Sequence, residues 1–130
     1  MDNLIIEACE RSPEVRFDAV GRTLSIRGES YPEDASAVFG PIFAWLNQFL
    51  EGAGPQPVRV DFELVYFNSS SAKALMNIFQ LLDRASGAGT PVTVHWRFAP
   101  DDETMKEFGE DFSEDLGHVK FALVELQGAG

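Results

Sequence analysis

Apolar and polar residues alternate along two stretches of this chain, as they do in strands with one face in the core and the other in water. In residues 58–67 the apolar positions run at every second residue up to Tyr66, and the positions between them include Asp61 and Glu63. The same alternation returns in residues 92–98. A parallel sheet buried on both faces would show unbroken apolar runs instead, so we expect helices to cover mainly one face of the sheet.

Two shorter stretches predict a hairpin near the N-terminus. Residues 15–18 and 23–27 each alternate, and they flank Val20-Gly21-Arg22, where a glycine is typical of a tight turn. A last strand is expected over residues 119–126. The sheet is therefore predicted to be mixed, with an antiparallel hairpin beside strands that are joined by helices.

Three segments carry apolar residues at helical spacing. The first covers residues 34–50 and contains Gly40-Pro41; since proline inside a helix costs about 3 kcal/mol, we expect a kink or a restart there. The second runs from residue 72 to Ser86-Gly87, and the third covers residues 102–116. A strand, a helix and a further strand in this order predict a right-handed parallel crossover.

The size of the chain limits it to one core. It has 130 residues, of which 45% are apolar, which is enough for one ordinary domain. We therefore predict a single α/β domain over residues 1–130, with a mixed sheet, an N-terminal hairpin and about three helices packed mainly on one face. Residues 127–130, rich in glycine, are expected to form a loose tail.

The charge balance narrows the classes of partner. The chain has 10 Lys and Arg against 21 Asp and Glu, a formal net charge of −11, which argues against binding to nucleic acid or to anionic membranes. Its partners are expected to present basic surfaces. The single cysteine, Cys9, excludes an internal disulfide, and neither a secretory signal nor a run of about 20 apolar residues is present. We expect a cytoplasmic protein.

Residue patterns typical of enzymes are scarce. Two histidines and one thiol show no metal-ligand spacing, there is no glycine-rich phosphate loop, and we expect neither metal nor cofactor. His95 is expected to be a solvated side chain. Asp61 and Glu63 share a strand face at about 7 Å, so a small acid–base enzyme is one alternative. The other is a solvated face with Arg59 as the counter-ion, since nothing signals a pocket that would separate the two pKa values.

A strand ends and a helix begins within a few residues around three serines. The apolar run stops at Asn68. The three serines, Ser69 to Ser71, come next, and apolar residues at helical spacing begin directly after them. This order leaves the hydroxyls beside the unpaired amides of the first helical turn. The serines either only cap the helix or accept a phosphate, whose charge a helix N-terminus tolerates. A phosphate there would turn a neutral surface into a strongly anionic one.

Short segments between Leu24 and Trp96 add a family resemblance. In order and spacing they resemble the SiaC family of bacterial regulatory phosphoproteins. The segments are Gly28-Glu29-Ser30-Tyr31-Pro32-Glu33, Phe39-Gly40, Trp45, Phe49-Leu50, the run from Tyr66 to Met76, Ile78-Phe79 and Leu81-Leu82.

The resemblance implies a fold and a switch. The fold it implies is a STAS-like domain, related to the anti-anti-sigma proteins. It implies phosphorylation at a hydroxyl after the asparagine by a cognate serine/threonine kinase, and removal of the phosphate by a PP2C-type phosphatase. The unmodified form would bind and activate a diguanylate cyclase in c-di-GMP signalling, which controls biofilm formation. A STAS-like regulator of a sigma factor is the alternative output.

The resemblance also assigns residues to the site. The acceptor, typically Thr in the family's Asn-Thr-Ser-Ser run, falls on Ser69, with Ser70 and Ser71 as alternatives. The partner-binding residues that it implies are Tyr31, Pro32, Glu33, Asn68, Ser69, Ser70 and Lys73. The acidic residues 101–115 are interpreted either as the outward side of a helix or as a surface that steers a basic partner.

Overall fold

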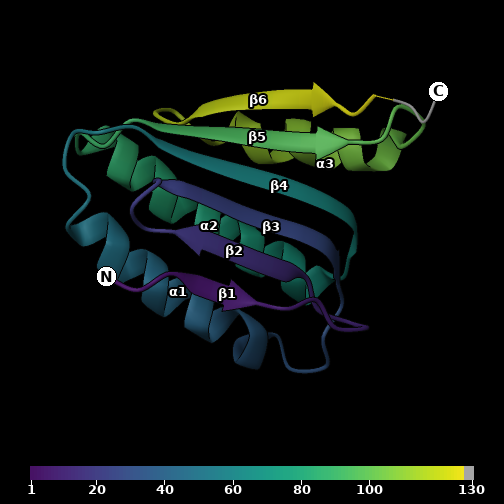
Figure 1. Cartoon of the computed structure of the whole chain (residues 1–130). Coiled ribbons are helices and arrows are strands. Elements are labelled where there is room, and N and C mark those ends of the chain that lie inside the picture. The colour runs from purple at the N-terminus through teal and green to yellow at the C-terminus, as the bar shows by residue number, and fades with distance from the viewer. Residues whose placement is uncertain (128–130) are drawn as a thin grey trace.

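The computed structural model describes residues 1–127, which form one mixed β-sheet and three helices (Figure 1). The strands are β1 (Leu4–Ile6), β2 (Glu14–Asp18), β3 (Thr23–Ser30), β4 (Val58–Phe67), β5 (Val92–Phe98) and β6 (Lys120–Glu125). The helices are α1 (Ala35–Glu51), α2 (Ser69–Gly87) and α3 (Glu103–Glu114). Beyond Gln127, the predicted loose tail lies outside the described residues.

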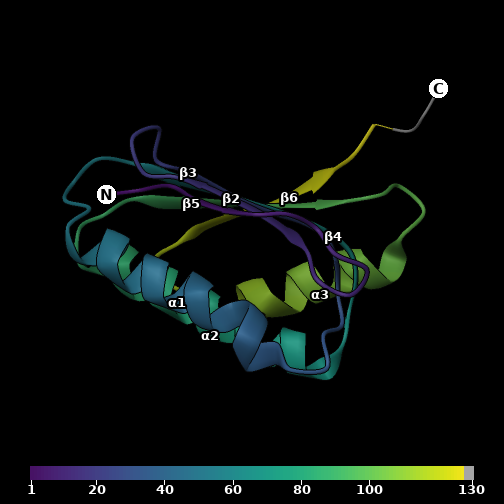
Figure 2. The ribbon, with the colours of Figure 1, turned by 60° about the horizontal axis from the view of Figure 1, so that its bottom comes forward.

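The strands follow one another across the sheet in chain order, from β1 to β6. β1, β2 and β3 pair antiparallel, and β3, β4, β5 and β6 pair parallel. The helices of the described residues lie on one face of the sheet, and the other face carries none (Figure 2). The predicted α/β domain, with its N-terminal hairpin and one-sided helices, is confirmed. The short edge strand β1 was not predicted.

The core lies between the helices and the covered face of the sheet. Its centre is aromatic: the ring of Phe62 lies 5.0 Å from that of Phe79 and 5.8 Å from that of Trp96. The indole N–H of Trp96 donates a hydrogen bond to the carbonyl of Met105 at 2.9 Å, which fixes the start of α3 against β5. A side chain at Gly109 would collide with the indole of Trp96, so only glycine lets α3 approach this closely.

Of the kink or restart expected at Pro41, the restart is excluded, because α1 is a single helix with Pro41 inside it. The carboxylate of Asp34 caps the helix by accepting the N–H of Ala37 at 3.3 Å. Buried apolar residues lie on both sides of the proline, Phe39 before it and Ile42 after it. Their burial holds the helix together despite the cost of about 3 kcal/mol that proline imposes on a helix interior.

The predicted inward position of Tyr66 is also wrong. The register between β3 and β4 shifts after Gly28, which faces Leu64, because the next pair joins Glu29 to Tyr66 and leaves Val65 as an extra residue. Such a bulge reverses which faces the following side chains occupy. Tyr66 is consequently 52% exposed, and Phe67 is the residue that enters the core.

Candidate functional site

The expected site residues meet at one edge of the sheet. β3 and β4 are parallel neighbours, so both end at the same edge, and the two helices that follow them also begin there (Figure 1). The segment Tyr31-Pro32-Glu33 precedes α1, and Asn68 precedes α2. The backbone N–H of Asn68 donates to the carbonyl of Ser30 at 3.0 Å, which ties the two segments together. We call the surface formed by residues 31–33 and 66–73 the serine corner.

Asn68, and not a serine, caps α2. Its side-chain oxygen accepts the N–H of Ser71 at 2.9 Å, and its carbonyl accepts the N–H of Ala72 at 2.9 Å. Asparagine is among the best N-cap residues because it satisfies an amide that has no partner inside the helix. The hydroxyls of Ser69 and Ser70 are therefore not needed as caps, and both residues are exposed.

Ser71 differs from the two serines before it. It is fully buried, and its hydroxyl lies 2.8 Å from that of Ser30, which is 1% exposed. A hydrogen bond between two buried hydroxyls holds the start of α2 against the end of β3, since either group alone would pay the cost of burial without a partner. Of the three predicted acceptors, only Ser69 and Ser70 are open to solvent in this structure.

Within the serine corner, Tyr31 is partly exposed and Glu33 is exposed, and each contacts a residue from another part of the chain. Tyr31 packs edge-to-face on Tyr66 with ring centroids 5.7 Å apart, and its N–H donates to the carbonyl of Arg11 at 2.8 Å. Glu33 pairs with the guanidinium of Arg11 at 2.7 Å. Pro32 is buried and positions its neighbours. Tyr66 was missed as a site residue because only the bulge, which depends on strand register, turns it outward.

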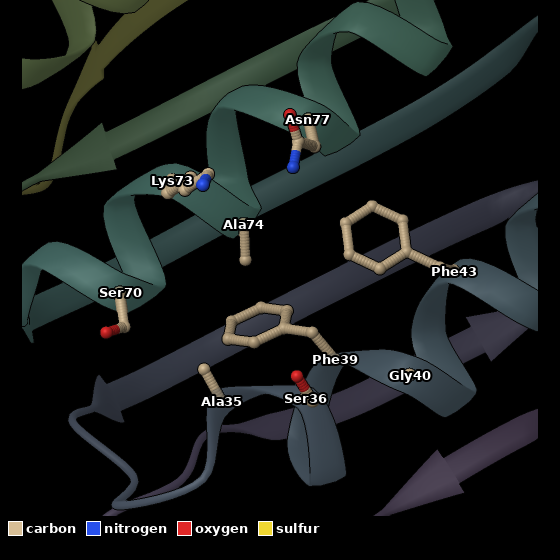
Figure 3. Close-up of a pocket in the computed structure, with 9 residues that line it drawn as sticks. All are labelled: Ala35, Ser36, Phe39, Gly40, Phe43, Ser70, Lys73, Ala74 and Asn77. Atoms are coloured by element: carbon tan, nitrogen blue, oxygen red, sulfur yellow. The ribbon is translucent and has the colours of Figure 1, made fainter.

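A shallow groove of about 380 Å³ separates α1 from α2 next to the corner (Figure 3). Local patterns in the chain do not predict this groove, because it forms only where the two helices lie side by side. Its floor is apolar, with the rings of Phe39 and Phe43 reaching in from α1. Its α2 side is more polar. The residues that line it are Ala35, Ser36, Phe39, Gly40, Phe43, Ser70, Lys73, Ala74 and Asn77.

The helix-free face of the sheet, by contrast, carries charges that pair with one another. Asp61 accepts from Arg59 at 3.1 Å, confirming that counter-ion, and its carboxylate lies 3.0 Å from Nδ1 of His95. The expectation of a solvated His95 is wrong, since its side chain is 25% exposed and partnered. Glu63 pairs with Arg27 at 3.3 Å. The two acids thus have separate cationic partners on this face of the sheet.

No three carboxylate, imidazole or thiol groups among residues 1–127 converge in a way that would hold a metal ion. None of the helices in this range combines the length and apolar character that a membrane crossing needs. The acidic residues of α3 lie on its exposed side, while Met105 and Phe112 face inward, as the amphipathic interpretation predicts.

The structure is a small one-sided α/β domain that presents an exposed serine pair at the start of a capped helix. Over residues 6–126 the sequence matches the SiaC family of regulatory phosphoproteins, and the chain belongs to this family. An uncharacterized protein of Pseudomonas aeruginosa strain UCBPP-PA14 is 36% identical over 115 residues, which cover 88% of this chain and 90% of the relative.

Solved structures agree with the family assignment. Apo-SiaC from Pseudomonas aeruginosa matches with a TM-score of 0.87 at 35% identity, covering 95% of this chain and 99% of the other. A further match, with a TM-score of 0.89 at 35% identity and the same two coverages, comes from a crystal structure of the diguanylate cyclase SiaD in complex with its activator SiaC, also from Pseudomonas aeruginosa.

Proposed function

We propose that this protein is a phosphorylation-controlled partner-switching regulator of c-di-GMP signalling. Its unmodified form binds and activates a diguanylate cyclase, and phosphorylation at Ser69 blocks that binding. The observation that carries the proposal is the match over nearly the whole chain to a SiaC that is crystallised with the cyclase it activates. Membership of a family of regulatory phosphoproteins supports the part of the proposal that concerns phosphorylation.

The chemistry of the switch follows from the position of Ser69. A kinase transfers the γ-phosphoryl group of ATP to the Ser69 oxygen, the hydroxyl proton leaves, and ADP is released. The phosphate brings about 1.5 to 2 negative charges to the first turn of α2, where the free amides and the helix dipole tolerate it. A partner that has to exclude water from the serine corner would instead meet an anion that it must desolvate, so binding weakens.

The choice of acceptor rests on exposure. Ser69 and Ser70 are exposed at the start of α2, so a kinase reaches either without unfolding the helix. Modification of Ser71 would require the first turn to open and the hydrogen bond to Ser30 to break. Ser69 follows directly after the capping Asn68, as the family acceptor does, which is why we place the phosphate there and keep Ser70 as the second choice.

The partner surface that we propose is the serine corner. Its exposed contact residues are Ser69, Ser70, Lys73, Glu33 and the half-buried Tyr31. Pro32 and Asn68 shape the corner from within, the first by burial and the second as the cap of α2. A cognate serine/threonine kinase and a PP2C-type phosphatase act on the same corner, in the cytoplasm, and the protein itself is not an enzyme.

Co-purification tests this function directly. Unmodified and kinase-treated protein are each incubated with a diguanylate cyclase of the same organism, and both complex formation and c-di-GMP synthesis are measured. We expect the unmodified protein alone to be retained and to raise synthesis. Mass spectrometry should place the phosphate on Ser69. Phosphate outside residues 69–71, or equal retention of both forms, contradicts the proposal.

The same pull-down separates the alternative outputs. Capture of a sigma-factor antagonist in place of a cyclase would favour the anti-sigma pathway, for which no observation of this structure speaks.

Replacing Asp61 and Glu63 by their amides tests the alternative that the protein is an acid–base enzyme. We expect unaltered activation of the cyclase, since both acids are already engaged in ion pairs on the far face of the sheet.

A further inference from the structure

Lys73 lies one helical turn after the proposed acceptor. Residues four apart share a face of an α-helix, and helical side chains lean toward the helix N-terminus, so a lysine at position 73 can extend over the turn that holds Ser69. Lys73 is exposed and borders the α1–α2 groove together with Ser70 (Figure 3). Its ammonium group is therefore within reach of the first turn of α2.

The acids near the corner already have partners. Glu33 pairs with Arg11 at 2.7 Å, and the carboxylate of Asp34 accepts the N–H of Ala37 as the cap of α1. Lys73 is in no ion pair within residues 1–127. Its positive charge is thus available to a new anion without breaking an existing contact.

We propose that Lys73 holds the phosphate of phosphorylated Ser69 in an intramolecular ion pair and is thereby withdrawn from the partner. This inference rests on the proposed function in taking Ser69 as the acceptor. In the unmodified protein the lysine is a free cation of the docking surface. After phosphorylation the lysine is engaged, and the pair carries about one net negative charge that a docking partner would have to desolvate.

A titration of the phosphate measures the ion pair directly. Phosphoserine is placed at position 69 of the full chain by genetic encoding, and its second pKa is read by ³¹P NMR in the wild type, in Lys73→Met and in Lys73→Arg. A neighbouring cation favours the dianion and lowers its pKa. We expect Lys73→Met to raise the phosphate pKa by about 0.2 to 0.7 pH units, the range of exposed pairs, and Lys73→Arg to keep the wild-type value.

Lys120→Met is the matched control. Lys120 is an exposed lysine at the start of β6, opposite Thr93, and so at the other edge of the sheet from Ser69. Its removal changes the net charge equally and should leave the phosphate pKa unchanged. The shift caused by Lys73→Met should also shrink in 1 M salt, where charges are screened within about 3 Å.

The result that overturns the inference is an equal phosphate pKa in the Lys73→Met and Lys120→Met proteins. The measurement needs neither kinase nor cyclase, so it fails separately from the proposed function. Loss of cyclase binding by the unmodified protein would contradict the proposed function and leave the ion pair standing, whereas phosphorylation at a residue other than Ser69 would overturn both. If Lys73→Met leaves the phosphate pKa unchanged while phosphorylation still controls cyclase binding, only the role of Lys73 is contradicted.

Discussion

The serine corner and the helix-free face of the sheet are both polar, yet their polar groups are used differently. On the open face, Asp61 contacts Arg59 and His95, and Glu63 contacts Arg27. At the corner, the two exposed hydroxyls and Lys73 are not used by the fold. Charges that neutralise one another offer little to a partner, whereas unused hydrogen-bonding groups beside an aromatic pair do. This contrast is why we propose the corner, and not the open face, as the docking surface.

A negative charge at the corner should have the largest effect. We expect Ser69→Asp to weaken binding to the cyclase at least tenfold, because the carboxylate must be desolvated at the interface, and Ser69→Ala to bind nearly as the wild type. Titration calorimetry of the complex gives both constants. Thr104→Asp is the matched control, since it puts the same charge into the first turn of α3. Equal losses in both variants would break the contrast between the two regions.

The second-largest effect is expected from removing one hydroxyl of the buried pair Ser30 and Ser71. Ser71→Ala is expected to lower the free energy of unfolding by about 1 to 3 kcal/mol, because it leaves the buried hydroxyl of Ser30 without its partner. Removing both hydroxyls should cost less than the sum of the single changes. Urea unfolding of the two single variants and the double variant gives the three values. Strict additivity would show that the two hydroxyls are independent.

Asp83, which lies in neither of these two regions, makes the stability of the fold depend on pH. Burial raises the pKa of this carboxyl, but the backbone N–H groups of Val119, His118 and Gly117 outweigh it and lower the pKa overall. A lowered folded-state pKa stabilises the protein above the unfolded value near 4, and this stability is lost as the pH falls through the folded-state pKa. Asp83→Asn should therefore destabilise by about 1 kcal/mol at pH 7 and by less near pH 3. Thermal unfolding at the two pH values measures the difference.

The smallest effect is expected on the open face. Glu63→Gln removes an exposed ion pair with Arg27, which contributes about 0 to 1 kcal/mol to stability. Cyclase binding should not change. A clear loss of binding would mean that the open face also takes part in docking, and the contrast with the serine corner would have to be given up.

Periodicity was a good guide to the fold because most elements bury one regular face. The strands at residues 58–67 and 92–98 and the helix after Asn68 are where the pattern predicts them. It left a kink or a restart open at Pro41, and the restart does not occur because the packing of Phe39 and Ile42 outweighs the local preference of proline. Tertiary contacts of this kind are not visible in a local pattern.

The site shows the same limit. The position of the serine corner follows from strand order, and the resemblance named its residues. The difference between Ser71 and the other two serines depends on Ser30, which is 41 residues away in the chain. The outward turn of Tyr66 and the partner of His95 depend likewise on which strands pair and in which register. None of these can be read from neighbouring residues.

The bulge lets β4 carry one residue more than the matching part of β3 without exchanging the faces of Tyr66 and Phe67. In an unbroken ladder that kept Val65, Tyr66 would face Ser30 and turn inward, and Phe67 would lie in water, because successive strand residues point to opposite sides. Deleting Val65 should instead leave the pairs of Glu29 with Tyr66 and of Ser30 with Phe67 in place, in a regular ladder. Val65 is thus a residue that β4 could lose while its aromatic neighbours keep their places in core and surface.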